Sequence, residues 1–273
     1  MQLDILFFNI SFIFYFLAII YNFVFAAVKK EKVFLVGFGA VIAGFFFHSA
    51  YIISRFIMSG YIPFTNIFES LVFFAWTLVV IYLIFSLKYK FELLGSFILP
   101  LVFLCYFHAI FLPKDINPLS DVLKSPWLNF HVIMSFFGYA TFALAFSTGL
   151  MYLLQEHYVK ARKPAPFYYL LPSLDILDEL NSRLVSIGFF LFTISIISGA
   201  FWAHKVWGSY WHWDPKVIGA LITWLIYVFY LICRHVYGWQ GKKVAYLSVI
   251  GFWSAILTFM VISSFKLGMH IFG

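Results

Sequence analysis

The placement of charged residues constrains this chain more than any other feature. Eight stretches of 17 to 31 residues contain no Asp, Glu, Lys or Arg, and together they cover 176 of the 273 residues. They are Ile5–Val28, Val33–Ser54, Ser70–Leu87, Leu93–Pro113, Ser125–Gln155, Leu184–His204, Val217–Cys233 and Val244–Phe265. A helix crosses the roughly 30 Å apolar core of a bilayer in about 20 residues, and lipid leaves helices and closed barrels as the only spanning structures. Since strand-like alternation is missing, the pattern predicts an all-α integral membrane protein, a single polytopic domain over residues 1–273 with eight transmembrane helices.

The composition excludes the other common classes of protein. With 64% hydrophobic and 11% charged residues, the chain lies far from soluble and from disordered proteins. Its two cysteines, Cys105 and Cys233, form no CxxC pair, no CxxCH haem-attachment motif and no zinc-binding spacing. The chain is therefore neither a disulfide-stapled scaffold nor itself a c-type cytochrome.

Basic residues are unevenly divided between the loops on the two sides of the expected helices. Twelve follow the first, third, fifth and seventh runs, and six lie on the opposite side. Because cytoplasmic loops carry the excess of Lys and Arg, this bias places both termini on the outer, periplasmic side. The formal net charge of +7 thus records orientation, and no nucleic-acid partner is expected. The first run lacks the basic region of a signal peptide before Lys29, so we expect it to stay as a helix.

One cytoplasmic segment, residues 156–182, is long enough to hold structure of its own. Within it, Leu174, Leu177 and Leu180 recur at helical spacing. They predict a short helix that lies in the membrane interface and leads into the next spanning helix. A plain linker docked on the membrane surface explains the same spacing equally well.

The outer loop at residues 203–217 concentrates aromatic residues. Its sequence, AHKVWGSYWHWDPKV, contains Trp207, Gly208, Tyr210, Trp211, Trp213, Asp214, Pro215 and Lys216. Tryptophan and tyrosine favour the headgroup region of any membrane protein, so an aromatic belt is one interpretation. Four aromatic rings in one loop also indicate a platform for a flat apolar ligand, because aromatic faces offer large stacking surfaces.

Because successive spanning helices run in opposite directions, four of the eight histidines are expected on this outer side: His131, His204, His212 and His270. Two neutral imidazoles on opposite faces of a porphyrin are a common way to hold haem iron, and cations such as Arg55, Lys205 or Lys216 would suit the haem propionates. A single interfacial histidine is more often an amphipathic side chain, and the residues alone do not single out a pair. His48 lies deeper, where an ionisable group is a functional candidate unless it merely bonds a neighbouring helix.

Several stretches resemble a known family of haem-handling membrane proteins of cytochrome c biogenesis. WGSYWHWDP is similar to the tryptophan-rich WWD signature of that family. The stretches similar to its CcsA/ResC-type branch are SGYIPFTNIFESLVFFAW (residues 59–76), WLNFHV, LPSLDILDELNSRLVSIGF followed by GAFWAHKVWG, and ALITWLIYVFYL. The resemblance extends from about residue 45 to the C-terminus.

This resemblance implies an enzyme subunit of the holocytochrome c synthase type in the bacterial cytoplasmic (inner) membrane. With a CcsB/ResB-type membrane partner, such a protein carries haem b, its transported substrate, across the membrane. It then presents the haem for thioether attachment to the CxxCH motif of an apocytochrome c. By motif position, the outer axial ligands of the iron would be His131 and His270, and no catalytic side chain beyond haem presentation is implied. Asp214 would hydrogen-bond within the loop or to a ligand histidine, and Lys216 would pair with a propionate.

Two positions depart from the pattern of the family. Val217 stands where an acidic residue is usual, and Ile232 stands where a histidine is thought to bind haem in transit. His235 lies three residues later on roughly the same helical face, so it either replaces that ligand or is an interfacial residue at the cytoplasmic end. Other functions left open are a b-type electron-transfer cytochrome, a haem-handover subunit that loads a carrier, and a permease that binds no haem.

Overall fold

The computed structural model describes residues 3–89, 91–120, 123–161 and 168–261, and every regular element in this part of the chain is a helix. The α-helices are α1 (Leu3–Val28), α2 (Glu31–Ser59), α3 (Ile67–Tyr89), α4 (Leu94–Ile110), α5 (Pro126–Ala161), α6 (Leu174–Trp207), α7 (Pro215–His235) and α8 (Lys242–Ile256). Each charge-free run overlaps one of them, which confirms the all-helical architecture. Six, namely α1, α2, α3, α5, α6 and α7, are long and apolar enough to span a membrane. Of the other two, α4 is apolar but has 17 residues, and α8 passes into a π-helix, η3 (Leu257–Val261).

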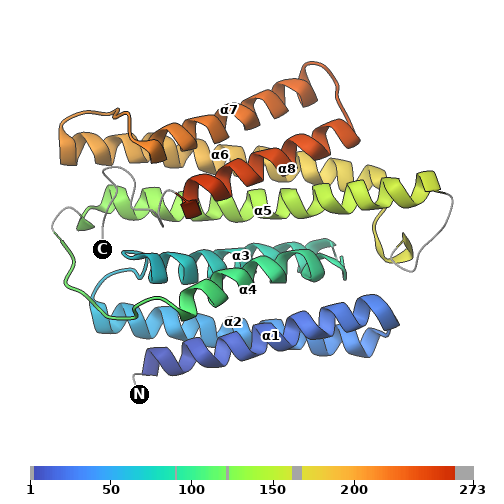
Figure 1. Cartoon of the computed structure of the whole chain (residues 1–273), viewed down its shortest axis with the longest axis horizontal. Coiled ribbons are helices and arrows are strands. Elements are labelled where there is room, and N and C mark those ends of the chain that lie inside the picture. The colour runs from blue at the N-terminus through green and yellow to red at the C-terminus, as the bar shows by residue number, and fades with distance from the viewer. Residues whose placement is uncertain (1–2, 90, 121–122, 162–167, 262–273) are drawn as a thin grey trace. The chain divides into compact units, whose positions relative to one another are not determined.

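The helices group into two compact units. The first comprises Met1–Pro118 and Lys163–Leu171 and contains α1 to α4, which lie side by side (Figure 1). The second comprises Leu119–Arg162 and Pro172–Gly273 and contains α5 to α8. Within the second unit, the start of α5, the end of α6 and the start of α7 lie at one end (Figure 1).

Local sequence signals set the helix ends at this end of the second unit. Proline occupies the first turn of α5 and of α7, where its missing N–H costs no helical hydrogen bond. Asp214 caps α7 by accepting a hydrogen bond from the backbone N–H of Lys216 at 2.8 Å. Gly208 ends α6 with a φ of 75°, a left-handed conformation that favours glycine. The aromatic loop expected at residues 203–217, called the Trp-rich loop below, thus includes the end of α6 and the start of α7, with residues 208–214 between the two helices.

The segment at residues 156–182, expected to hold a short helix that leads into the next spanning helix, contributes its last residues to α6 itself. Leu174, Leu177 and Leu180 belong to the first turns of α6 itself, which runs without a break over 34 residues. Ser173 caps this helix, its hydroxyl accepting a hydrogen bond from the Ile176 N–H. No glycine or proline interrupts residues 174–187, so nothing separates a short helix from the spanning one. A 3₁₀ turn, η2 (Tyr168–Leu170), precedes α6, and residues 162–167 lie outside the described part.

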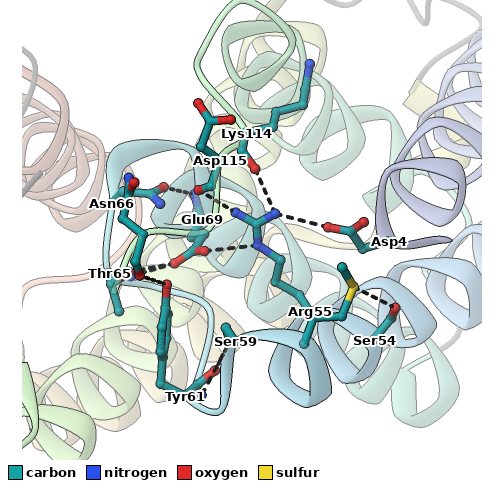
Figure 2. Close-up of polar contacts among 12 residues, drawn as sticks. Asp4, Ser54, Arg55, Ser59, Tyr61, Thr65, Asn66, Glu69, Lys114 and Asp115 are labelled. Atoms are coloured by element: carbon teal, nitrogen blue, oxygen red, sulfur yellow. Dashed lines mark hydrogen bonds and ion pairs between the residues drawn. The ribbon is translucent and has the colours of Figure 1, made fainter. Parts of the chain in front are cut away.

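The first unit is tied together by a buried cluster around Arg55 of α2 (Figure 2). Its Nε donates to Glu69 of α3 at 3.1 Å, and its Nη1 donates to Asp4 of α1 at 3.0 Å. The three side chains are 0% exposed. The guanidinium also donates to the carbonyl oxygens of Lys114 (2.8 Å) and Asp115 (3.0 Å), in the segment after α4. One cation thus joins three helices and the chain that leaves the fourth.

The connection between α2 and α3 holds the Glu69 carboxylate from its other side. The second carboxylate oxygen accepts hydrogen bonds from the N–H of Thr65 at 3.0 Å and from its hydroxyl at 2.8 Å. Close by, Tyr61 donates its hydroxyl to the Asn117 carbonyl at 2.9 Å. Burial, followed by the charge of Glu69, raises the pKa of this hydroxyl above its ordinary value. Glu69 is thus paired through both oxygens, as a buried charge requires.

In the second unit, the uncharged side chain of Asn181 on α6 joins the helices, as Arg55 does in the first unit. Its Nδ2 donates to the Ala145 carbonyl of α5 at 2.6 Å and to Ser248 Oγ of α8 at 3.0 Å. Its Oδ1 accepts a hydrogen bond from the Tyr230 hydroxyl of α7 at 2.8 Å. Asn181 is 2% exposed, so a single buried amide links all four helices of this unit.

Candidate functional site

The aromatic residues of the Trp-rich loop divide into buried and exposed groups. Trp202 is buried in the last turns of α6, and its ring contacts that of Trp207 edge to face, with centroids 5.0 Å apart. Tyr210, Trp211 and Trp213 are 54%, 39% and 80% exposed. The rings of Trp211 and Trp213 meet almost at right angles, 5.5 Å apart. The loop therefore has an anchored aromatic base and three rings open to the surroundings.

Asp214 and Lys216 lie where the loop passes into α7. Asp214 is 3% exposed, and its carboxylate caps α7. A hydrogen bond within its own loop was one of the two roles considered for Asp214, and the structure contains it. Pro215 follows as the first residue of the helix, and Lys216 is part-buried in the first turn.

His131 lies in the second turn of α5, with its ring packed against α6. Its Nδ1 is 2.7 Å from the backbone carbonyl oxygen of Ser195. Because a carbonyl can only accept, this contact places the proton on Nδ1 and the lone pair on Nε2. Neutral imidazole with a lone pair on Nε2 is a common metal-binding form of histidine, and the partner at Nδ1 holds the ring in place.

A row of aromatic rings, each in contact with the next, connects the start of α5 to the Trp-rich loop. Trp127, one turn before His131, stacks on Phe201 of α6 with centroids 5.2 Å apart. Phe201 in turn meets Tyr210 of the loop edge to face at 6.0 Å. Tyr210 stacks on His204 at 4.1 Å, with the rings 16° from parallel. The C-terminal part of α6 thus brings the surroundings of His131 and the loop together.

The structure places the other candidate histidines differently. His204 is engaged in the stack with Tyr210, and His212 meets Trp207 edge to face at 5.4 Å, with its Nε2 buried and unpaired among the described residues. His235 is the last residue of α7 and is exposed, at the end opposite to the loop. His270 lies outside the described residues.

Two residues weighed from the sequence are committed to internal contacts. His48 is fully buried, with Nε2 3.1 Å from the Val72 carbonyl and Nδ1 3.2 Å from the Tyr15 hydroxyl. It bonds neighbouring helices, which was the alternative to a functional role. Arg55 was considered as a cation for a propionate, but two carboxylates and two carbonyls already occupy its guanidinium. Neither side chain is available to an external ligand in this arrangement.

Comparison with known proteins identifies the family. The family model described as Cytochrome C assembly protein matches residues 64–270. The chain is 33% identical to the cytochrome c biogenesis protein CcsA of Guillardia theta, over 97% of this chain and 92% of that protein. The CcsA protein of Marchantia polymorpha is 30% identical, over 96% of this chain and 94% of the relative. The chain belongs to the cytochrome c assembly protein family.

A solved structure agrees with this assignment at the level of the fold. The fold of this cytochrome c assembly protein is similar to that of the cytochrome c haem lyase CcmF, with a TM-score of 0.69 at 13% identity. The match covers 96% of this chain and 47% of CcmF, so the chain spans about half the length of that protein. The molecule is thus a helical membrane protein of cytochrome c biogenesis.

Three residues of this cytochrome c assembly protein that surround His131 escaped the sequence-based reasoning. They are Ser135 on α5 and Ser195 and Gly199 on α6. A signal for the last two was available, because Ser195 and Gly199 are small residues four apart in an apolar helix. Such pairs let membrane helices approach closely. No comparable signal marks Ser135.

Proposed function

We propose that this protein carries haem across the membrane and presents it at the outer face for covalent attachment to an apocytochrome c. It does so as a synthase subunit with a CcsB/ResB-type membrane partner, and haem b is its cargo. Eight helices span the membrane with both termini outside. His131 and His270 bind the iron from opposite faces, the Trp-rich loop holds the ring, and Lys216 pairs with a propionate.

The position of His131 against α6 carries this proposal. Its contact with the Ser195 carbonyl leaves the lone pair of the imidazole on Nε2, the form that binds iron. The same helix ends twelve residues later at Trp207, where the aromatic loop begins. The helix that orients the proposed iron ligand on α5 is therefore also the helix that leads into the aromatic loop, which suits a flat metal-containing ring.

The exposure of the loop supports presentation over permanent enclosure. Tyr210 and Trp213 keep more than half of their surface open, whereas an electron-transfer haem needs no open platform. Each thioether forms when a cysteine S–H adds across a vinyl C=C, so sulfur bonds one carbon and the proton goes to the other. The thiols belong to the apocytochrome, and this chain supplies no nucleophile. Its contribution is to hold and orient the ring, an effect of proximity.

Replacing His131 with alanine is expected to reduce the haem that co-purifies with the full-length protein and to shift its absorbance spectrum. The reason is the loss of one of two axial ligands, and added imidazole should restore the six-coordinate spectrum. His157→Ala is the matched control, because His157 is an exposed residue near the other end of the same helix. Undiminished haem with an unshifted spectrum in His131→Ala would remove the assignment. Haem that stays on the wild-type protein, and leaves an added reduced CxxCH peptide unmodified, would instead indicate a resident b-type cytochrome.

The double substitution Trp211→Ala with Trp213→Ala is expected to weaken haem retention by about tenfold or more. Loss of two stacking rings costs on the order of 1 kcal/mol each. Membrane insertion and thermal stability should not change, because both rings are exposed. Trp253→Ala is the control, since Trp253 is 55% exposed on α8 and lies outside the loop. Unchanged haem affinity in the double variant would refute the platform.

A further inference from the structure

The ring of His131 occupies a space on α6 that exists because residue 199 is glycine. A β-carbon at Gly199 would lie 2.7 Å from Nδ1 and 2.8 Å from Cε1 of the imidazole. Non-bonded carbon and nitrogen atoms prefer separations of about 3.5 Å or more. Any side chain at position 199 would therefore push the ring away from the helix, and with it away from the Ser195 carbonyl.

Two serine hydroxyls border the same ring. The Ser195 hydroxyl oxygen is 3.2 Å from Nδ1, in addition to the 2.7 Å contact of the Ser195 carbonyl. Ser135, one turn after His131 on α5, is hydrogen-bonded to the Ser195 hydroxyl. The Ser135 hydroxyl also contacts the His131 carbonyl at 2.8 Å. The imidazole is thus held from the side of Nδ1 by α6, and the two helices are joined beside it.

We propose that Gly199, Ser195 and Ser135 are positioning residues that fix the orientation and the tautomer of the His131 imidazole, and so set how strongly its Nε2 binds haem iron. This inference rests on the proposed function, since it presumes that His131 is an axial ligand. It adds residues that do not touch the iron themselves. Their contribution is the one that outer partners make at metal sites, where they orient the ring and raise the basicity of the coordinating nitrogen.

The contact of Nδ1 with the Ser195 carbonyl affects how strongly Nε2 would bind iron. A hydrogen bond from Nδ1–H to a carbonyl makes Nε2 a stronger donor to iron than it would be in a solvent-exposed imidazole. The Ser195 carbonyl belongs to the backbone, so no side-chain substitution at position 195 removes it. Gly199 is therefore the position at which the contact between the ring and that carbonyl is most directly broken.

Gly199→Ala tests the inference in the full-length protein purified in detergent and titrated with haem. We expect the affinity for haem to fall about 10- to 100-fold, the usual effect of losing an outer partner. We expect imidazole to restore the low-spin spectrum, as in His131→Ala. The electron paramagnetic resonance spectrum of the ferric haem should also change, because it reports the orientation of the axial imidazole planes. Gly39→Ala is the matched control, since nothing lies within 4 Å of a β-carbon at that helical glycine.

A second variant covers the case in which Gly199→Ala lowers the thermal unfolding midpoint. The double substitution Ser135→Ala with Ser195→Ala adds no atoms and keeps the Ser195 carbonyl. It should retain haem but shift the reduction potential and the paramagnetic resonance spectrum. A role confined to helix packing would leave both of these readouts unchanged.

The outcomes separate this inference from the proposed function. If His131→Ala loses haem while a well-folded Gly199→Ala keeps wild-type affinity and spectra, the positioning role is wrong and the ligand assignment stands. If His131→Ala also keeps wild-type haem, the proposed function fails and the inference fails with it.

Discussion

Replacing Arg55 with alanine is expected to lower the stability of the first unit by about 3–5 kcal/mol, the usual cost of breaking a buried ion pair. The substitution leaves the carboxylates of Asp4 and Glu69 buried without their cation. It also removes the donors to the Lys114 and Asp115 carbonyls, so the segment after α4 loses its attachment. Thermal unfolding of the purified protein in detergent measures the effect.

Two further variants make the Arg55 prediction specific. Lys160→Ala breaks an ion pair with Glu156 in which the lysine is 67% exposed, and it should leave the midpoint unchanged. The triple substitution Asp4→Asn, Arg55→Met and Glu69→Gln removes all three charges together. It should be less damaging than Arg55→Ala alone, because no uncompensated charge remains. If Arg55→Ala were as stable as the wild type, the cluster would contribute nothing to the stability of the fold.

The helices could be predicted from the sequence because their cause is local. Lipid excludes charges over about 20 residues, so gaps in the charge pattern locate each helix, and Pro126 and Pro215 mark two helix starts. The extent of α6 could not be read in this way. Its first turns carry charges, among them Asp178, which is paired with Arg234 of α7 at 2.7 Å. A pairing across 56 residues satisfies that charge, and a count of local charges cannot detect it.

The candidate site shows the same division between local and distant causes. The alternation of helix direction predicted that His131 and the Trp-rich loop lie on one side, and in the structure both lie near the C-terminal end of α6. The atoms that orient the ring were beyond prediction, because the partner of Nδ1 is a backbone carbonyl 64 residues away. Arg55 shows the opposite error. We counted Arg55 among the cations of the outer loops, but in the structure two carboxylates from other helices neutralise it. Because these carboxylates are distant from Arg55 in the sequence, the sequence does not reveal the pairing.

Replacing Asn181 with leucine is expected to destabilise the second unit by about 2–3 kcal/mol, since buried polar groups lose their partners. Leucine preserves the approximate volume of the side chain but cannot donate to the Ala145 carbonyl or to Ser248. It also leaves the buried Tyr230 hydroxyl without its acceptor. In water such groups would be rehydrated, but among four packed helices in lipid that compensation is largely lost.

A graded series distinguishes this polar junction from simple packing. Tyr230→Phe removes only the one donor to Asn181 and should cost less than Asn181→Leu, about 1 kcal/mol. Combining Asn181→Leu with Tyr230→Phe should then recover part of the loss, because no hydroxyl remains unpaired. Asn9→Leu, at an exposed position of α1, is the control for the chemistry of the substitution itself. Strictly additive effects of the two substitutions would show that Asn181 and Tyr230 act independently. Coupling between them would establish that the Asn181 amide helps to hold α7 against α6, in addition to the pair of Arg234 with Asp178. The helix stabilised in this way is the one that carries the Ser195 carbonyl and leads into the Trp-rich loop.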